Sequence, residues 1–136
     1  MTYIDCFLTP VPRANKTHYE KLAQISSGVV REYGALRVVE CWLDETGTDT
    51  STYHADNARQ TSDSYATMTA AASAKNDETV VMSWIEWADK RSRDEGMKKV
   101  MADSRMQFDD MEPVFDGSSL IAGGFRPMLD HSRILM

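Results

Sequence analysis

The chain has 136 residues, of which 42% are hydrophobic and 26% are charged, and its formal net charge is -6 with a pI near 5.0. This length fits one domain with a modest core, and the proportions are those of a globular protein rather than a disordered or membrane chain. The acidic balance disfavours nucleic acid as a partner, because such binding depends on clustered Lys and Arg that neutralise phosphates.

The amino-terminal segment lacks the features of a targeting sequence. It carries an acid where a signal peptide has a basic start and an apolar stretch, and no apolar run approaches the roughly 18 residues that span a bilayer. We therefore expect a cytoplasmic protein with no membrane partner. Its two cysteines, Cys6 and Cys41, lie in apolar runs without a metal-ligand spacing, and we expect both to be reduced core residues.

The first predicted elements are a strand and a helix. Residues 2–9 are rich in aromatic and β-branched side chains and are followed by prolines, which predicts a strand. Residues 14–35 place apolar side chains three and four positions apart, as in a helix with one buried stripe. Thr17 and Glu20 form a candidate capping box at its start, and Gly34 suits a left-handed stop at its end.

Two more strands are predicted at residues 35–45 and 79–88, which are rich in Val, Cys and Trp. Between them, residues 46–78 are dominated by Thr, Ser, Ala and Asp and are too numerous for a hairpin loop. Their Ala and Met content favours a helix within residues 55–75, whereas Thr and Ser favour an irregular excursion. Both readings of this insert remain open.

A second long helix is predicted from Asp89 or Ser92, either of which can cap it, to about Asp103. Its basic residues are interpreted as a solvated face. They are Lys90, Arg91, Arg93, Lys98 and Lys99. Residues 107–117 have the composition of a loop, and residues 118–129 predict a last strand whose two glycines allow a bulge.

The resulting order of strands and helices predicts the fold class. An order of βαββαβ generates a ferredoxin-like, four-stranded antiparallel sheet with both helices on one face. We therefore expect a single α+β domain over residues 1–136, with the insert at about 46–78 between the second and third strands.

Alternation along the strands sorts the side chains between the two faces of this sheet. The aliphatic and small set is expected under the helices, and it comprises Ile4, Cys6, Leu8, Val39, Cys41, Leu43, Val81, Ser83, Ile85, Leu120 and Ala122. The aromatic and acidic set is expected on the other face, and it comprises Tyr3, Asp5, Phe7, Val38, Glu40, Trp42, Met82, Trp84, Glu86, Ile121 and Phe125. Trp87 is expected on the helix side, as a core residue.

An apolar patch of that size needs a cover. The expected cover is a second copy of the sheet, because closed two-fold dimers bury a self-complementary surface. The homodimer would then be a dimeric α/β barrel with an interior cavity. Bulges, the insert or a neighbouring subunit's tail at residues 131–136 are alternative covers.

Several segments resemble the YbaA-like family of small bacterial proteins of unknown function. They are "RVVECW" at 37–42, "ETVVMSWIEWADKRSRD" at 78–94, "MADSRM" at 101–106, "FDGSSLIAGGF" at 115–125 and the opening at 3–23. The resemblance implies the ferredoxin-like fold and the homodimer of the dimeric α/β-barrel superfamily. It supplies no catalytic residue, since none is established for the family. The insert at 46–78 departs from the family pattern.

Five residues of the aromatic and acidic face form the predicted ligand site: Asp5, Glu40, Trp42, Trp84 and Glu86. Buried acids are costly unless they are paired, hydrogen-bonded or metal-bound. Crowding and desolvation would raise the pKa of at least one of them, giving a general acid or base near neutral pH. The tryptophans suit a cationic or aromatic small molecule. Their register across the strands decides whether they converge.

Two functions therefore stay open. The first is a cytoplasmic homodimer that binds or transforms a small organic molecule in this cavity. The alternative is a noncatalytic dimer that acts through its surface and the insert. In a purely structural reading, the acids instead bond to Arg37, Arg105 or Arg126 of the same or the partner chain and fix the register of the dimer. No dinucleotide fingerprint, phosphate loop or metal-ligand spacing occurs in the sequence, so no cofactor or metal is expected.

Overall fold

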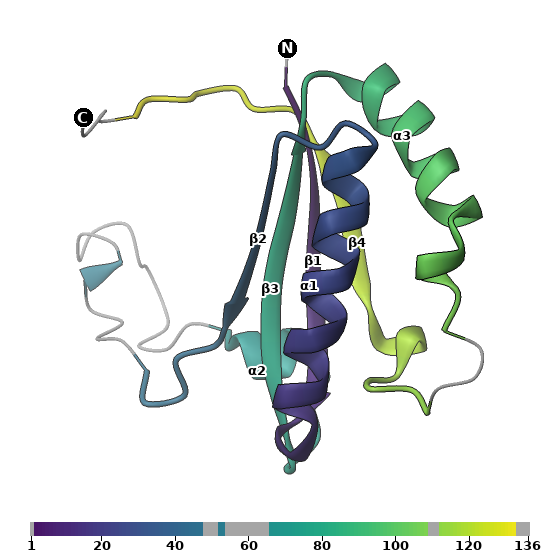
Figure 1. Ribbon diagram of the computed structural model, residues 1–136. Helices are drawn as coiled ribbons and strands as arrows, with labels where there is room; N and C mark the ends of the chain where they lie inside the picture. The colour runs from purple at the N-terminus through teal and green to yellow at the C-terminus, as the bar shows by residue number, and fades with distance from the viewer. Residues whose placement is uncertain (1, 48–51, 54–65, 109–111, 133–136) are drawn as a thin grey trace.

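The computed structural model describes residues 2–47, 52–53, 66–108 and 112–132. Its main elements follow in the order β1 (Tyr3–Pro12), α1 (Lys16–Glu32), β2 (Arg37–Trp42), α2 (Met68–Ala71), β3 (Glu78–Trp87), α3 (Lys90–Ala102) and β4 (Ile121–Phe125). The strands form one antiparallel sheet in the order β2-β3-β1-β4, and both long helices lie on one side of it (Figure 1). The predicted α+β class is confirmed.

Strand β1 is longer than predicted, because it continues through Pro10 and Pro12, which pair with Val80 and Glu78 of β3. Proline has no N–H to donate and is tolerated where that side of a strand is unpaired. On its other side β1 pairs with β4 only over residues 4–8. The prolines therefore extend the strand where one of its edges is already free.

The structure corrects one predicted helix end and confirms another. The predicted capping box of Thr17 and Glu20 is wrong, because α1 begins before Thr17 and its first turn has no side-chain cap. The predicted left-handed stop is confirmed, since Gly34 has a φ of 115°. Helix α3 is capped by Asp89, whose carboxylate accepts a 2.7 Å hydrogen bond from the backbone N–H of Ser92.

The register corrects the predicted faces of the sheet. Asp5 of β1 pairs with Ile85, and Glu40 of β2 pairs with Ser83, so these four side chains share one face. That face lies under the helices, because Asp5 contacts α3 and Glu40 contacts α1. The predicted faces are therefore exchanged for β1 and β2 and correct for β3.

Two apolar clusters fill the space between the sheet and the helices. The first surrounds Trp87, which is fully buried against Val29, Val30, Ala35 and Val100. The second joins Val11, Tyr19 and Val81 near the start of α1. The prediction that Trp87 is a core residue is confirmed.

Gly96 brings α3 into contact with the Trp87 ring. A Cβ at position 96 would lie 2.7 Å from that ring and 2.5 Å from the carbonyl oxygen of Tyr33. The glycine therefore marks a close approach of the helix to the core.

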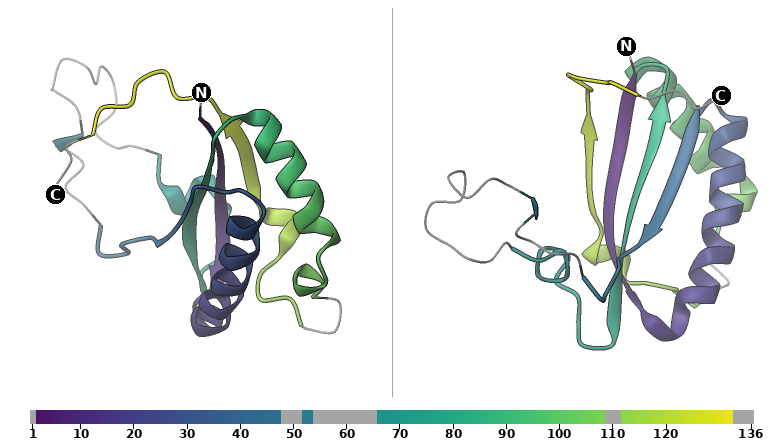
Figure 2. Two further views of the ribbon diagram at one scale, coloured as in Figure 1. Left: turned by 45° about the horizontal axis from the view of Figure 1, so that its top comes forward. Right: turned by 90° about the vertical axis from the view of Figure 1, so that its left-hand side faces the viewer.

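The sheet surface that faces away from α1 and α3 is called the open face here. Its apolar members include Ile4, Cys6, Leu8, Val39, Cys41, Met82, Trp84, Ile121 and Phe125. The right-hand view of Figure 2 looks onto this face, with the strands in front of the helices. Three of these apolar side chains are exposed, Met82 at 41%, Ile121 at 48% and Phe125 at 57%.

Both cysteines lie on the open face and are half-buried free thiols, so their predicted place in the core under the helices is wrong. Cys6 is opposite Trp84 and Cys41 is opposite Met82, which leaves β3 between them. Two strand spacings amount to roughly 10 Å, whereas a disulfide needs Cα atoms within about 7 Å. The two thiols of one chain therefore cannot bridge.

The described part of the insert contains α2, a single turn capped by Thr67, whose hydroxyl accepts a 3.0 Å hydrogen bond from the N–H of Ala70. The helix expected within residues 55–75 lies partly outside the described residues. Within the described ranges, no helix combines the length and the apolar character needed to cross a bilayer.

Candidate functional site

The structure separates the five predicted site residues. Asp5, Glu40 and Trp42 lie between the sheet and the helices, whereas Trp84 and Glu86 lie on the open face. The expectation that all five share one face is therefore wrong. The physical reason is the register between the strands. Asp5 and Glu40 pair with Ile85 and Ser83 of β3, whereas the predicted set groups them with Trp84 and Glu86, one residue further along.

Asp5 has a structural partner for each oxygen of its buried carboxylate. Its Oδ2 accepts hydrogen bonds from Trp87 Nε1 at 3.1 Å and Arg93 Nε at 3.0 Å, and its Oδ1 lies 3.3 Å from the same Arg93 atom. Arg93 was interpreted as part of a solvated face. Arg93 lies three residues before Gly96 and seven before Val100, and both of these residues are buried. This helical spacing is the signal that places Arg93 on the inner side of α3.

Glu86 is bonded within the open face. Its Oε2 accepts a 3.0 Å hydrogen bond from Trp84 Nε1 and lies 3.7 Å from Arg37 Nη1. Of the arginines offered as alternative partners for the acids, Arg37 therefore pairs with Glu86 within the same chain. Arg105 instead pairs with acids at the ends of α1 and α3, and Arg126 lies over the Tyr3 ring.

Glu40 and Tyr19 form the polar centre of the candidate site. The Tyr19 hydroxyl donates a 2.7 Å hydrogen bond to Glu40 Oε1. The buried ring of Tyr19 meets Trp42 and Phe115 edge-on, with centroids 5.4 and 5.9 Å away. The helical spacing of apolar residues had already placed Tyr19 on the buried stripe of α1. It gave no indication that Glu40 is the partner.

The surroundings of this pair shift both pKa values. Burial, and then the Glu40 carboxylate, raises the pKa of Tyr19, so the phenol remains a donor. Desolvation by the surrounding protein raises the pKa of Glu40 above its ordinary value, and the hydrogen bond from Tyr19 opposes that rise. Glu40 remains open to solvent, so the desolvation is partial.

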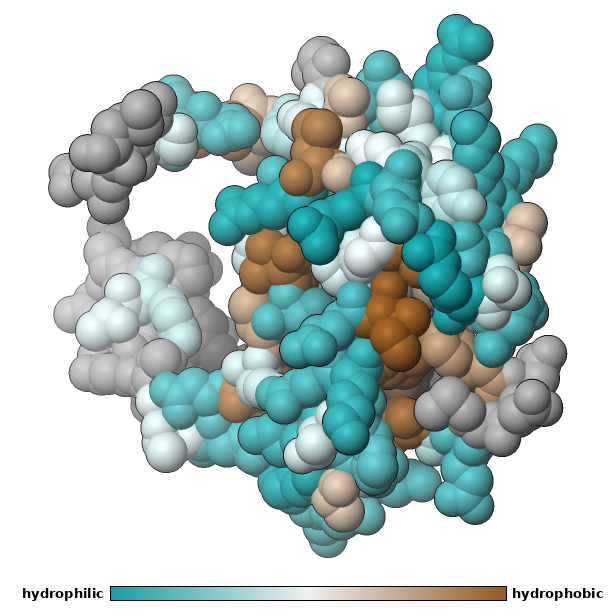
Figure 3. Space-filling model, viewed as in Figure 1, coloured by the Kyte–Doolittle hydropathy of each residue, from teal (hydrophilic) through white to brown (hydrophobic). Residues whose placement is uncertain are grey.

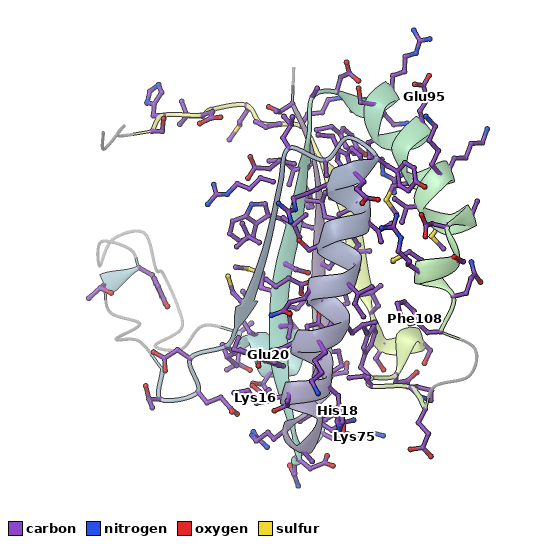
Figure 4. All side chains as sticks on the ribbon, in the orientation of Figure 1. Lys16, His18, Glu20, Lys75, Glu95 and Phe108 are labelled. Carbon is purple, nitrogen blue, oxygen red and sulfur yellow. The ribbon has the colours of Figure 1, made fainter. Side chains whose placement is uncertain are left out.

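A pocket of about 470 Å³ lies beside this pair, between α1 and the segment that follows α3. Its walls are largely apolar and include Leu22 of α1 and Met106, Phe108, Val114 and Phe115 of the later segment. Apolar atoms gather between the two long helices in Figure 3, and Figure 4 shows Phe108 beside α1. A volume of this size fits a small organic ligand.

A second hollow of about 400 Å³ also includes Glu40. It contains Trp42, whose ring lies under Lys16 Nζ at 4.7 Å and whose Nε1 donates a 2.9 Å hydrogen bond to Glu20 Oε2. Figure 4 shows Lys16 and Glu20 on the side of α1 away from Phe108. Trp42 is thus engaged by two residues of α1, and the larger pocket is the better ligand site.

One oxygen of Glu40 remains available to a ligand. Of the residues whose positions are described, none donates a hydrogen bond to Oε2 or forms an ion pair with this carboxylate. The same part of the chain contains no group of three or more His, Cys, Asp or Glu side chains arranged to hold a metal ion. Glu40 can therefore accept a hydrogen bond from a ligand, form an ion pair with a cation, or take up a proton from a bound molecule.

Comparison with known proteins gives a family without an assigned activity. A family model described as "Protein of unknown function (DUF1428)" matches residues 2–117. The chain is 36% identical to the "Uncharacterized protein YbaA" of Escherichia coli K12 over 131 residues, which cover 96% of this chain and 99% of that protein. The same identity and coverage relate it to the protein of that name from Shigella flexneri.

Proposed function

Because the chain belongs to the DUF1428 family, whose function is unknown, we propose from its own geometry that it is a homodimer that binds a small organic molecule beside Tyr19 and Glu40. The observation that carries this proposal is a partly desolvated carboxylate, held by a buried phenol, on the wall of an apolar pocket of about 470 Å³. Largely apolar pockets with a few placed polar groups are the usual form of ligand sites.

The proposed site retains only part of the predicted one. Glu40 lies in the pocket, and Trp42 packs behind Tyr19. Asp5 is excluded as a free ligand-binding group, because Trp87 and Arg93 already occupy its carboxylate. Trp84 and Glu86 belong instead to the surface proposed for dimerisation.

The dimer would form through the open face of ferredoxin-like subunits, as in a dimeric α/β barrel. The strand order β2-β3-β1-β4 and the antiparallel pairing support that subunit fold. The exposed side chains of Met82, Ile121 and Phe125 support the interface, because a monomer rarely leaves such a patch uncovered. The carboxy-terminal segment 126–132 extends on the same side of the sheet (Figures 1 and 2), and Leu129 within it is 69% exposed.

Sedimentation of matched variants tests the dimer. Ile121→Glu places a charge on the open face, whereas Met101→Glu places the same charge on α3, where the original side chain is 63% exposed. Burying an unpaired charge is costly, so the first variant is expected to raise the dimer dissociation constant by at least about tenfold. The second variant should leave it unchanged. A wild-type chain that sediments as a monomer at micromolar concentration would contradict the proposal.

A thermal-shift screen against metabolites at two pH values tests ligand binding. A ligand that binds only the folded chain raises its melting temperature. Glu40→Gln is expected to reduce that rise, while Glu86→Gln, an equal change on the open face, should not. Failure of Glu40→Gln to change the response of any stabilising ligand would overturn the proposed site.

The alternative function is a noncatalytic dimer that acts through its surface. It is supported by the exposed Met68 of the insert, at 46%, and it predicts a stable dimer that no ligand in the screen stabilises. The cytoplasmic location expected from the sequence stays a prediction.

A further inference from the structure

The charged side chains among the described residues that line the proposed pocket have one sign. Glu40 and Glu112 are the charged side chains among its described lining residues, which include no Lys, Arg or His. The hollow on the other side of Glu40 adds Glu20 and Trp42. Lys16 Nζ lies 4.7 Å from the centroid of the Trp42 ring, and among the described residues no ion pair joins Lys16 to Glu40. Tyr19, the hydrogen-bond partner of Glu40, stays a neutral donor.

Glu40 therefore lacks a counter-charge. Transferring a carboxylate into a partly apolar site costs free energy unless a cation or several donors compensate it. Here one phenolic hydroxyl donates to Oε1, and Oε2 receives no hydrogen bond from a described residue. The other two acids discussed above differ in this respect, because Asp5 pairs with Arg93 and Glu86 lies near Arg37.

We propose that the pocket takes a protonated amine attached to an apolar, aromatic-sized body, with the ammonium at Glu40 Oε2. This inference rests on the proposed function and names the ligand class of the same site. The ligand supplies the missing charge and a hydrogen-bond donor together, and a charge-assisted hydrogen bond is stronger than a neutral one.

The walls suit the rest of such a molecule. Phe108, Phe115 and the Tyr19 ring line the pocket together with Leu22 and Val114. Aromatic faces attract cations as well as apolar groups. A flat or branched hydrocarbon body can therefore lie between α1 and the later segment while its amine reaches Glu40.

An anionic ligand fits this site poorly. Two glutamates would repel it. The basic side chain of Lys21 lines an adjoining groove that shares Leu22, Phe108 and Val114 with the pocket, but that groove does not include Glu40 or Tyr19. Figure 4 shows His18 near the first turns of α1, below Phe108. A phosphate or carboxylate at Glu40 would therefore lack a positive partner.

Three probes of similar shape test the ligand class: 2-phenylethylamine, 2-phenylethanol and phenylacetate, each titrated into the wild-type chain by calorimetry at pH 8. The amine is expected to bind at least about tenfold more tightly than the alcohol, the size of effect that one hydrogen bond to a charged group supplies. Phenylacetate is expected to bind most weakly. This comparison requires no variant, so it does not depend on whether a substitution disturbs folding.

Variants then locate the effect. Glu40→Gln should bring the amine within about threefold of the alcohol, because it removes the charge and keeps the shape of the side chain. Phe108→Ala should weaken both probes, whereas Glu95→Gln on the exposed side of α3 should weaken neither. Because the amine stays protonated, its binding to the wild type should strengthen as pH rises and Glu40 loses its proton.

The outcomes separate the two proposals. Equal or tighter binding of the alcohol or phenylacetate, lost in Phe108→Ala, overturns the amine class and leaves the pocket in place. Amine binding that persists in Glu40→Gln also overturns the inference. Failure of all three probes to bind overturns it too, and the metabolite screen then decides the fate of the proposed function separately.

Discussion

Replacing Gly96 by Ala should destabilise the protein, although the same substitution in a free helix does the opposite. Ala is favoured over Gly by about 0.8–1.0 kcal/mol in a helix interior. At position 96, however, the new methyl group would lie 2.5 Å from the Tyr33 carbonyl oxygen and 2.7 Å from the fully buried Trp87 ring. Neither neighbour is a flexible chain end, so the helix has to move away from the core.

The expected magnitude follows from these opposing effects. Overpacking a well-filled core costs about 1–3 kcal/mol, and separating α3 from Trp87 also loses dispersion contacts. After subtracting the propensity gain, we expect a net loss of about 1–2 kcal/mol in the free energy of unfolding. With a urea m value of about 2 kcal/mol per molar, in the middle of the usual range for small proteins, the denaturation midpoint should fall by roughly 0.5–1 M.

Gly28 of α1 provides the matched control. A Cβ there would meet no atom within 4 Å, so Gly28→Ala should raise stability by about 0.5–1 kcal/mol. Both variants are compared with wild type by tryptophan fluorescence in urea at one fixed protein concentration, because a dimer's stability depends on concentration. A Gly96→Ala chain as stable as Gly28→Ala would refute the close-approach argument.

Three further outcomes are expected from the acids. Asp5→Ala should cost at least about 1–3 kcal/mol, because the buried indole N–H of Trp87 loses its acceptor, and an unchanged urea midpoint would contradict this. The folded-state pKa of Glu40 lies above its ordinary 4.5. Protonated Glu40 therefore contributes fully to the stability of the fold below pH 4.5, and this contribution is lost as pH rises through the folded-state pKa. Glu40→Gln should therefore gain stability relative to wild type between pH 4 and 8, as measured by melting temperature, and a constant difference would exclude the desolvation. The Arg105 guanidinium holds the pKa of Asp103 well below its usual range. Asp103→Asn should therefore be less stable than wild type at pH 7, and melting curves should show this difference shrinking as the pH falls below 3.8, because wild type then loses the contribution of the carboxylate.

The order of elements was predictable because each carries its own local signal. Helical spacing identified α1, and the two candidate caps, Asp89 and Ser92, bracketed the start of α3, which the structure places at Asp89. The predicted antiparallel sheet followed from that order. The extension of β1 through Pro12 was missed, because the tolerance for proline depends on where β4 ends, and that is a property of the pairing rather than of the segment.

The candidate site was only partly predictable, because alternation fixes which residues share a face within a strand but not which face is covered. In β1 both sets are apolar or aromatic, with Tyr3 and Phe7 against Ile4 and Leu8. The pairing of Asp5 with Ile85 decides which set of β1 side chains lies under the helices, and only the register between strands supplies that pairing. The site segment around Phe108 was missed for another reason, since its residues have no periodicity and gain their position from packing against α1.

Strand β3 places Trp84 and Trp87 on opposite faces of the sheet, one on the open face and one sealed in the core. Because an indole's emission depends on its contact with water, these two rings report on different places in the molecule, while the third tryptophan, Trp42, packs against α1. If the proposed dimer forms through the open face, separation of its subunits would make the Trp84 ring accessible to a quencher while the Trp87 ring stays shielded, and only loss of the fold would expose Trp87. In a Trp42→Phe variant, fluorescence would thus distinguish disassembly of the proposed dimer from unfolding without an added label.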